Sequence, residues 1–143
     1  MKQYHTTITI QASVEQVWSE LTDFSAYPQW NPIVGKLEGK MQEGNQIATY
    51  IVPLGKTFHP TLLSFKPQQE IVWQGAQGAK FLLAGKHYYR LEKISPHATR
   101  LLHGEYFTGL FSYFIAQDLL QKMIQAFESH NQLLKQRIEN GKK

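Results

Sequence analysis

Residues 4–10 open the chain with β-branched and aromatic side chains, a pattern that predicts a strand. Ser13 then stands where a helix N-cap side chain is expected, and Gln16 three residues later completes a capping box. Apolar residues follow at helical spacing and predict a short amphipathic helix that ends near Asp23. These apolar residues are Val14, Val17, Trp18 and Leu21.

The next segment, residues 24–32, combines aromatic residues with Pro28 and Pro32. Each proline disfavours helical backbone in the residue before it, so we expect at most one helical turn and then a fixed loop. From residue 33 to residue 107, short apolar runs alternate with turn-forming residues, which is typical of an antiparallel meander. The predicted turns lie at residues 43–45, 53–56, 66–69, 75–78 and 95–97.

The hydrophobic period changes near the end of the chain. From residue 112 to residue 138 the pattern predicts one amphipathic helix of about 27 residues, roughly 40 Å long. Its apolar stripe comprises Ile115, Leu119, Met123, Ala126, Phe127, Leu134 and Ile138. The order of elements predicts an α+β fold with two short helices after the first strand and a curved antiparallel sheet of six or seven strands around the long helix.

One helix covers only a stripe of such a sheet. A concave sheet that grips a single long helix therefore tends to leave a cavity beside it. The high aromatic content of 13% suits both a wide core and a pocket for apolar ligands. The alternating sets between residues 47 and 65 are about equally apolar, so the sequence does not predict which of them faces this cavity.

Composition narrows the function classes. A length of 143 residues suits one domain, residues 1–143. The net charge of +4 is scattered without a basic stripe, so nucleic acid is not a predicted partner. The absence of cysteine excludes disulfides and thiolate metal sites. The N-terminal residues lack a signal-peptide core, and the chain has no apolar run long enough for a membrane span, so we expect a cytoplasmic protein.

Two strands of the meander carry polar side chains on the faces predicted to point inward. The first set is Phe81, Leu83, Gly85, His87, Tyr89 and Leu91, and the second is Thr99, Leu101, His103, Glu105 and Phe107. A turn at residues 95–97 would place His87 opposite or diagonal to Glu105, and Tyr89 near His103 or Glu105.

An inward carboxylate is costly to bury alone, so Glu105 should pair with a histidine or stay protonated. Three interpretations remain open for this patch: it orients a bound ligand, it is a structural hydrogen-bond network, or His87 and Glu105 act as acid and base with His103 or Tyr89. Two histidines and a carboxylate also resemble a metal ligand set, but the spacing is weakly specific and we predict no metal.

Further candidate contacts come from aromatic and apolar residues. Trp30 either rims the cavity entrance or anchors its loop, and Trp73 lines either the pocket or the core. Phe111, with its aromatic neighbours, forms either a gate or a hydrophobic staple at the helix start. The candidate ligand-binding residues are Trp30, Trp73, Phe81, Leu83, His87, Tyr89, His103, Glu105, Phe107, Phe111, Ile115, Leu119 and Met123.

Several segments together resemble a known superfamily. They are ASVEQVW at 12–18 running into LTDFSAYPQWNP at 21–32, then IVWQG at 71–75, GKHYYRL at 85–91 and TRLLHGEYFTG at 99–109. Their order and spacing resemble the SRPBCC superfamily, which includes START domains and birch-pollen-allergen-like proteins, and within it the polyketide cyclase/dehydrase branch. The resemblance spans nearly the whole chain and implies a helix-grip fold with a deep, metal-free hydrophobic pocket.

The resemblance does not imply one activity, because carriers, sensors, cyclases and co-chaperones share this frame. The leading expectation is a protein that binds a hydrophobic small molecule, such as a lipid, a quinone or a polyketide-like aromatic compound. A cyclase or dehydratase that uses His87 and Glu105 is the enzymatic alternative. A co-chaperone-type interaction module is the third. No cofactor is predicted, and the ligand's identity and the oligomeric state stay open.

Overall fold

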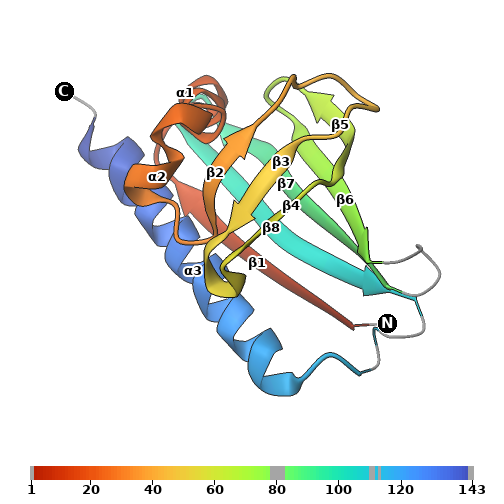
Figure 1. Cartoon of the computed structure of the whole chain (residues 1–143). Coiled ribbons are helices and arrows are strands. Elements are labelled where there is room, and N and C mark those ends of the chain that lie inside the picture. The colour runs from red at the N-terminus through yellow and green to blue at the C-terminus, as the bar shows by residue number, and fades with distance from the viewer. Residues whose placement is uncertain (1, 78–82, 110–111, 113, 142–143) are drawn as a thin grey trace.

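The computed structural model describes residues 2–77, 83–109, 112 and 114–141. It is an α+β structure in which one long helix lies against a curved antiparallel sheet (Figure 1). The helices are α1 (Val14–Leu21), η1 (Phe24–Ala26), α2 (Tyr27–Trp30), η2 (Val52–Leu54) and α3 (Gln117–Asn140). The strands are β1 (Lys2–Ile10), β2 (Val34–Glu38), β3 (Ala48–Ile51), β4 (Lys56–Phe58), β5 (Thr61–Lys66), β6 (Glu70–Gln77), β7 (Leu83–Ser95) and β8 (Ala98–Thr108).

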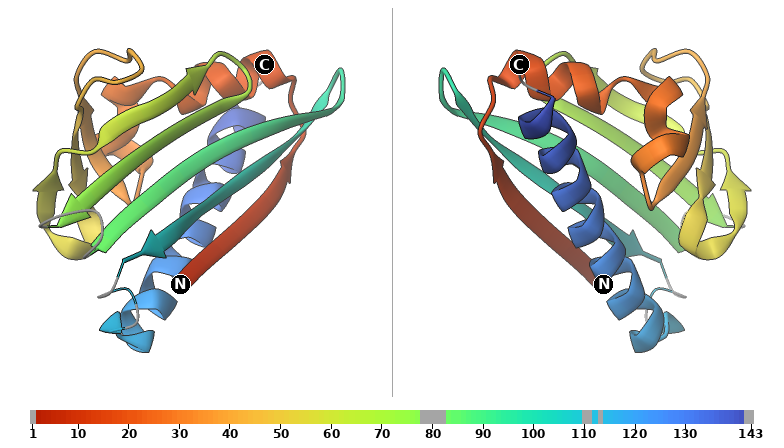
Figure 2. Two further views of the ribbon diagram at one scale, coloured as in Figure 1. Left: turned by 90° about the vertical axis from the view of Figure 1, so that its right-hand side faces the viewer. Right: turned by 90° about the vertical axis from the view of Figure 1, so that its left-hand side faces the viewer.

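Eight strands form two sheets within the described part of the chain. The larger sheet has the order β1-β8-β7-β6-β5, and the smaller has the order β2-β3-β4. Figure 2 shows α3 crossing one face of the larger sheet, with α1, α2 and the smaller sheet on the same side. The predicted fold class is confirmed, although the expected sheet of six or seven strands is divided into two.

The division falls at Pro60. Proline has no N–H group to donate, so it interrupts a hydrogen-bonded ladder. Its carbonyl still accepts from Ile47 N–H at 2.9 Å, and a single bridge between Gln46 and Thr61 joins the two sheets. The smaller sheet is therefore separate from the larger one, and it lies on the side of the larger sheet that α3 occupies.

The first helix begins as predicted. Ser13 Oγ accepts from Gln16 N–H at 3.2 Å, and Gln16 Oε1 accepts from Ser13 N–H at 3.1 Å, which completes the capping box. The helix ends at Leu21, close to the predicted end. Two short helical segments then occupy residues 24–30, so the prediction of at most one helical turn followed by a loop is wrong: Pro28 lies in the first turn of α2, where a missing N–H group is tolerated.

The turn predicted at residues 75–78 is wrong at its start, because β6 continues through Gly75 to Gln77. Gly75 pairs directly with Gly85 on β7, so the glycine here lies within a strand, at a position where the sheet has no side chain, and not in a turn. The predicted turns at 66–69 and 95–97 do connect consecutive strands.

The long helix starts later than predicted, at Gln117 instead of residue 112. Gly109 has a positive φ of 98°, and its carbonyl accepts from both the backbone N–H and the hydroxyl of Ser112. These tight local bonds bend the chain before the α-helix begins at its Ala116 cap.

The buried stripe of α3 also differs from the predicted one at its first turn. Leu119 is 36% exposed, whereas Leu120 is buried. Leu120, Phe127 and Leu134 are seven residues apart, which is nearly two full turns, whereas steps of four residues from 119 drift around the helix. The buried residues of the helix are Leu120, Met123, Phe127, His130, Asn131, Leu134 and Ile138.

Phe127 joins the helix to the sheet. Its ring stacks on His103 with centroids 4.0 Å apart and meets the Tyr4 ring edge-on at 4.9 Å. The side chain has no exposed surface. No helix of the described chain is both long and apolar enough to cross a membrane.

We expect Phe127→Ala to lower the free energy of unfolding by about 3–5 kcal/mol, because it removes a fully buried ring and leaves a void. Urea denaturation followed by far-UV circular dichroism measures this change. Leu133→Ala on the exposed side of the same helix is the matched control and should cost much less. Equal losses in the two variants would contradict the packing role of Phe127.

Candidate functional site

A cavity of about 290 Å³ lies between the two sheets and the first half of α3. This volume is close to the lower end of the usual range for small-molecule sites. The wall is mainly apolar, with a few polar groups. The lining residues are Tyr4, Ile33, Val34, Thr49, Ile51, Leu54, Phe58, Pro60, Trp73, Gly75, Gly85, His87, Glu105, Phe107, Ile115, Leu119, Leu120 and Met123.

Glycines keep part of this space open. Gly75 and Gly85 face each other across β6 and β7, so neither strand places a side chain in the cavity at this level. A Cβ atom on Gly85 would lie 2.7 Å from Glu105 Oε2 and 3.3 Å from the Phe107 ring. The carboxyl group of Glu105 therefore occupies room that only glycine leaves free.

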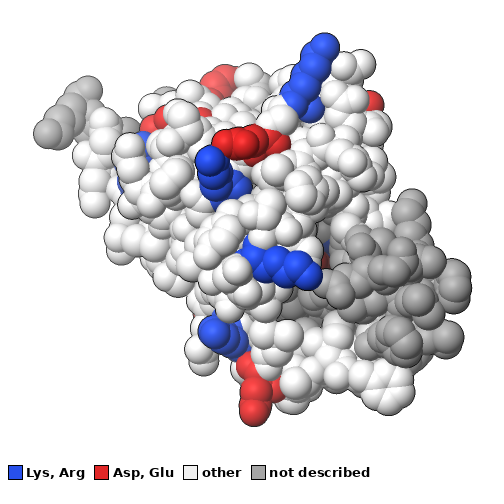
Figure 3. All heavy atoms as spheres, viewed as in Figure 1, with Lys and Arg blue, Asp and Glu red and all other residues white. Residues whose placement is uncertain are grey.

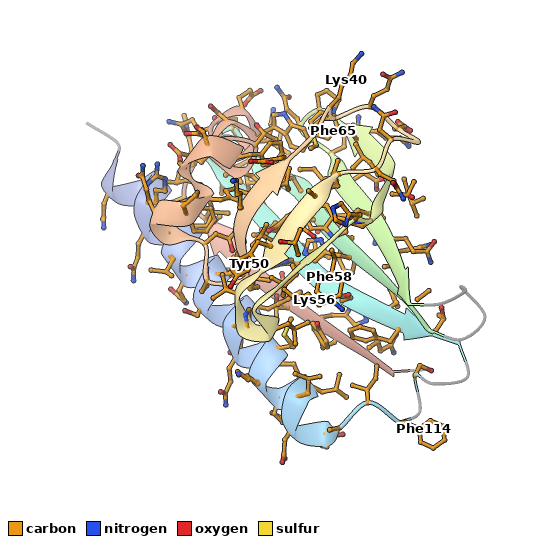
Figure 4. The ribbon with its side chains drawn as sticks, in the orientation of Figure 1. Lys40, Tyr50, Lys56, Phe58, Phe65 and Phe114 are labelled. Atoms are coloured by element: carbon orange, nitrogen blue, oxygen red, sulfur yellow. The ribbon has the colours of Figure 1, made fainter. Side chains whose placement is uncertain are left out.

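The cavity opens beside η2 and the start of α3. Leu54 and Leu119 both line it, and both keep more than a third of their surface exposed. Phe58 and Lys56 lie on β4, and Lys56 Nζ sits 5.3 Å from the centre of the Phe58 ring (Figure 4). Lys and Arg side chains are scattered over the face shown in Figure 3 and do not form a stripe there.

The structure brings together many of the residues predicted from the sequence. Those that line the cavity are Trp73, His87, Glu105, Phe107, Ile115, Leu119 and Met123. Tyr89 and His103 are fully buried and lie in the hydrogen-bond network next to His87 rather than among the lining residues. Trp30 packs against the rings of Tyr27 and His130 instead of the cavity. Phe81, Phe111 and the side chain of Leu83 lie outside the described residues.

Sequence reasoning missed one whole wall. The smaller sheet and its connections contribute Ile33, Val34, Thr49, Ile51, Leu54, Phe58 and Pro60. Alternation did not identify the inward side of residues 47–65, because both sets of residues there are similarly apolar, and residues 33 and 34 were not assigned to a face. Tyr4 was missed for a different reason: the residues of its strand were not assigned to faces.

Glu105 and Tyr4 form the first polar feature of the cavity. The Tyr4 hydroxyl donates to Glu105 Oε1 at 3.1 Å. Burial raises the pKa of Glu105 to about 7, although the hydrogen bond from Tyr4 opposes this shift. Burial beside this carboxyl also raises the pKa of Tyr4. A pKa of about 7 brings Glu105 closer to the second of the two predicted outcomes, because a large fraction of the carboxyl holds its proton at neutral pH.

His87 is the second polar feature. It lies directly opposite Glu105 in the β7–β8 register, as Tyr89 lies opposite His103. Its ring stacks on Trp73 with centroids 4.2 Å apart and an interplanar angle of 16°. His87 Nε2 is hydrogen-bonded to His103 Nε2 at 2.8 Å, whereas His87 Nδ1 is buried without a partner among the described residues. An unsatisfied buried polar atom costs about 1–3 kcal/mol, so this nitrogen is an unused hydrogen-bonding position in a ring that lines the cavity.

Behind His87, two further side chains of α3 complete a buried polar network. Asn131 Oδ1 lies 3.0 Å from the Nδ1 atoms of both His103 and His130. His130 Nε2 in turn lies 2.9 Å from the Tyr89 hydroxyl. The signal for His130 and Asn131 was present in the sequence, because they fall three and four residues after Phe127 on the apolar stripe. Polar residues at such core positions indicate a buried network.

Burial keeps all three imidazoles neutral. It lowers the pKa of His87 and of His103 well below the ordinary value, and nearby His130 lowers both further. Burial lowers the pKa of His130 to about 4, with the Asn131 hydrogen bond opposing the shift. Among the described residues, no group of three or more His, Asp or Glu side chains is arranged to hold a metal ion.

These pKa shifts predict that acid destabilises the fold. Between pH 6.5 and 4.5 the three histidines are neutral when folded and protonated when unfolded, whereas Glu105 is protonated only when folded. Unfolding therefore takes up a net two protons. The free energy of unfolding should decrease as the pH decreases, with a slope that approaches about 2.7 kcal/mol per pH unit. Urea titrations at several pH values measure this slope. A free energy that stays constant or rises on acidification across this window would contradict the assignment.

Comparisons with known proteins place this geometry in a family. A comparison with curated proteins finds no significant match. Among solved structures, the chain resembles protein MLL2253 from Mesorhizobium loti (TM-score 0.75, 14% identity, covering 99% of this chain and 100% of that one). It also resembles a START superfamily protein from Mycobacterium smegmatis (TM-score 0.70, 18% identity, 96% and 97% covered). A third similar structure is the Zhui aromatase/cyclase from Streptomyces sp. R1128 (TM-score 0.69, 15% identity, 96% and 93% covered).

At these identities the solved structures establish the fold alone. The family model described as "Polyketide cyclase / dehydrase and lipid transport" matches residues 1–139, nearly the full length. The chain therefore belongs to the polyketide cyclase/dehydrase and lipid transport family.

Proposed function

We propose that this protein binds a hydrophobic small molecule in the cavity between its sheets and α3, as a carrier or a sensor. The observation that carries the proposal is the mainly apolar cavity with polar groups at only a few positions. This combination is typical of sites in which apolar contacts supply affinity and a few polar groups fix orientation. Membership of a family described by cyclase, dehydrase and lipid transport functions supports the same class of ligand.

The cavity entrance also supports binding. Leu54 and Leu119 lie at its rim with 44% and 36% of their surface exposed. Exposed apolar residues that continue into a cavity give an apolar ligand a path from solvent to the interior. Met123 lies deeper, buried on α3, and its flexible thioether side chain adapts to ligands of different shapes.

The second candidate function is acid–base catalysis of the cyclase or dehydratase class. The observation in its favour is the pKa of about 7 for Glu105, which suits proton transfer at neutral pH. Glu105 would donate or accept the proton, Tyr4 would orient it, and neutral His87 opposite would act as the complementary base. The Zhui aromatase/cyclase has the same fold, which makes such chemistry compatible with this frame.

Filling the cavity tests the binding proposal. Wild-type protein should bind the neutral fluorescent probe N-phenyl-1-naphthylamine with an increase in probe emission. Met123→Trp places a larger side chain in the cavity and should weaken binding at least tenfold. Leu133→Trp, on the exposed side of α3, is the matched control and should bind like the wild type. Equal binding by all three proteins, or no binding by the wild type, would exclude this cavity as the site.

Native mass spectrometry of freshly purified protein distinguishes a carrier from an enzyme. A carrier should retain a molecule of the same mass in the wild type and in Glu105→Gln. A dehydratase should lose about 10²–10⁴-fold in turnover when its acid is removed, so the variant should retain the unreacted precursor, heavier by one water molecule. Identical bound masses in the two proteins would contradict the dehydratase proposal.

A further inference from the structure

Neutral histidines carry one proton each, so a chain of hydrogen bonds between them fixes which nitrogen holds it. The chain here begins at Thr6. Its hydroxyl donates to the His103 carbonyl at 2.7 Å, so its oxygen accepts from Asn131 Nδ2 at 2.8 Å. This contact sets the orientation of the Asn131 amide and points its oxygen at the imidazoles of His103 and His130.

The amide oxygen of Asn131 can only accept. His103 and His130 therefore both carry their proton on Nδ1, 3.0 Å from that oxygen. Each ring is then left with a lone pair on Nε2. For His130 this lone pair accepts from the Tyr89 hydroxyl. For His103 it accepts from His87 at 2.8 Å.

His87 must consequently carry its proton on Nε2, which leaves a lone pair on Nδ1. That nitrogen is buried and has no partner among the described residues, and the His87 ring lines the cavity. Rotation of the ring would break the bond to His103 and the stacking on Trp73. His87 thus carries a fixed hydrogen-bond acceptor at its buried Nδ1, in a ring that lines the cavity.

We propose that His87 Nδ1 selects ligands that present a neutral hydrogen-bond donor, a hydroxyl or N–H group on an otherwise hydrophobic body, and that Asn131 is the positioning residue that sets this preference. The inference rests on the proposed binding function and specifies its ligand class. An apolar ligand without a donor leaves Nδ1 unsatisfied, which costs free energy.

A matched pair of probes tests the preference. 2-Naphthol has the hydroxyl donor, and 2-methoxynaphthalene replaces its hydrogen with a methyl group. Wild-type protein should bind 2-naphthol up to about tenfold more tightly, since one neutral hydrogen bond separates the two. In His87→Phe, which retains an aromatic ring against Trp73, the ratio of the two dissociation constants should fall to about one. His97→Phe changes an exposed histidine in the β7–β8 turn and should keep the wild-type ratio.

The role of Asn131 has its own test. In Asn131→Asp a carboxylate sits between His103 and His130 and favours their protonated forms. A protonated His103 donates from Nε2, so His87 must accept there and move its proton to Nδ1. The preference for 2-naphthol should then disappear, whereas a purely structural Asn131 would leave the ratio unchanged in protein that still folds.

Nitrogen-15 NMR of the imidazoles in wild-type protein tests these proton positions without any substitution. We expect the proton on Nε2 of His87 and on Nδ1 of His103 and His130. A proton on Nδ1 of His87, or equal affinity of the wild type for the two probes, would overturn this inference and leave the binding function intact. Failure of the wild type to bind either probe or N-phenyl-1-naphthylamine would instead overturn the proposed function, and the ligand preference with it.

Discussion

The hydrogen bond between His103 and Asn131 joins the two halves of the structure. His103 stands in the middle of β8 and Asn131 in the second half of α3, and both are almost completely buried. This hydrogen bond fixes both the position of the helix along its axis and its rotation about that axis, because a shift by one residue would separate the donor from the acceptor. Apolar packing around Phe127 supplies attraction between the same elements but tolerates more variation in their relative position.

This anchoring explains where the cavity lies. In its second half, α3 is held against the sheet by the polar network, by Leu134 and by Ile138. Beside its first half, β6 and β7 carry Gly75 and Gly85, so neither of these strands fills the space between the sheets with a side chain at this level. The same helix is therefore tightly packed at one end and stands over an open space at the other. The smaller sheet, turned away at Pro60, closes the remaining side.

Strand periodicity made part of this site predictable. The alternation in residues 81–107 and the turn at 95–97 predicted His87 opposite or diagonal to Glu105 and Tyr89 near His103 or Glu105. The structure has His87 directly opposite Glu105 and Tyr89 directly opposite His103. The buried face of α3 was predicted less well. In the sequence, apolar residues at steps of four from Leu119 are as regular as those at steps of seven from Leu120, and the structure buries the second set. The polar partners on α3 were missed because a search for an apolar stripe passes over His130 and Asn131. The part of the wall that β3 and β4 supply was not predictable by alternation, because both alternating sets between residues 47 and 65 are about equally apolar.

The polar groups of the cavity and of the network behind it have one physical property in common: burial favours their neutral forms. The desolvation that raises the pKa of Glu105 to about 7 also lowers the pKa of His130 to about 4. A carboxylate beside a protonated imidazole would have formed an ion pair and filled its own hydrogen-bonding capacity. Because Glu105 bonds to Tyr4 and His87 bonds to His103, the two groups opposite each other are not consumed by a mutual bond. A carboxyl that holds its proton up to about pH 7 and a neutral imidazole thus lie in the wall of an apolar space, and this arrangement suits a neutral molecule that can both donate and accept hydrogen bonds.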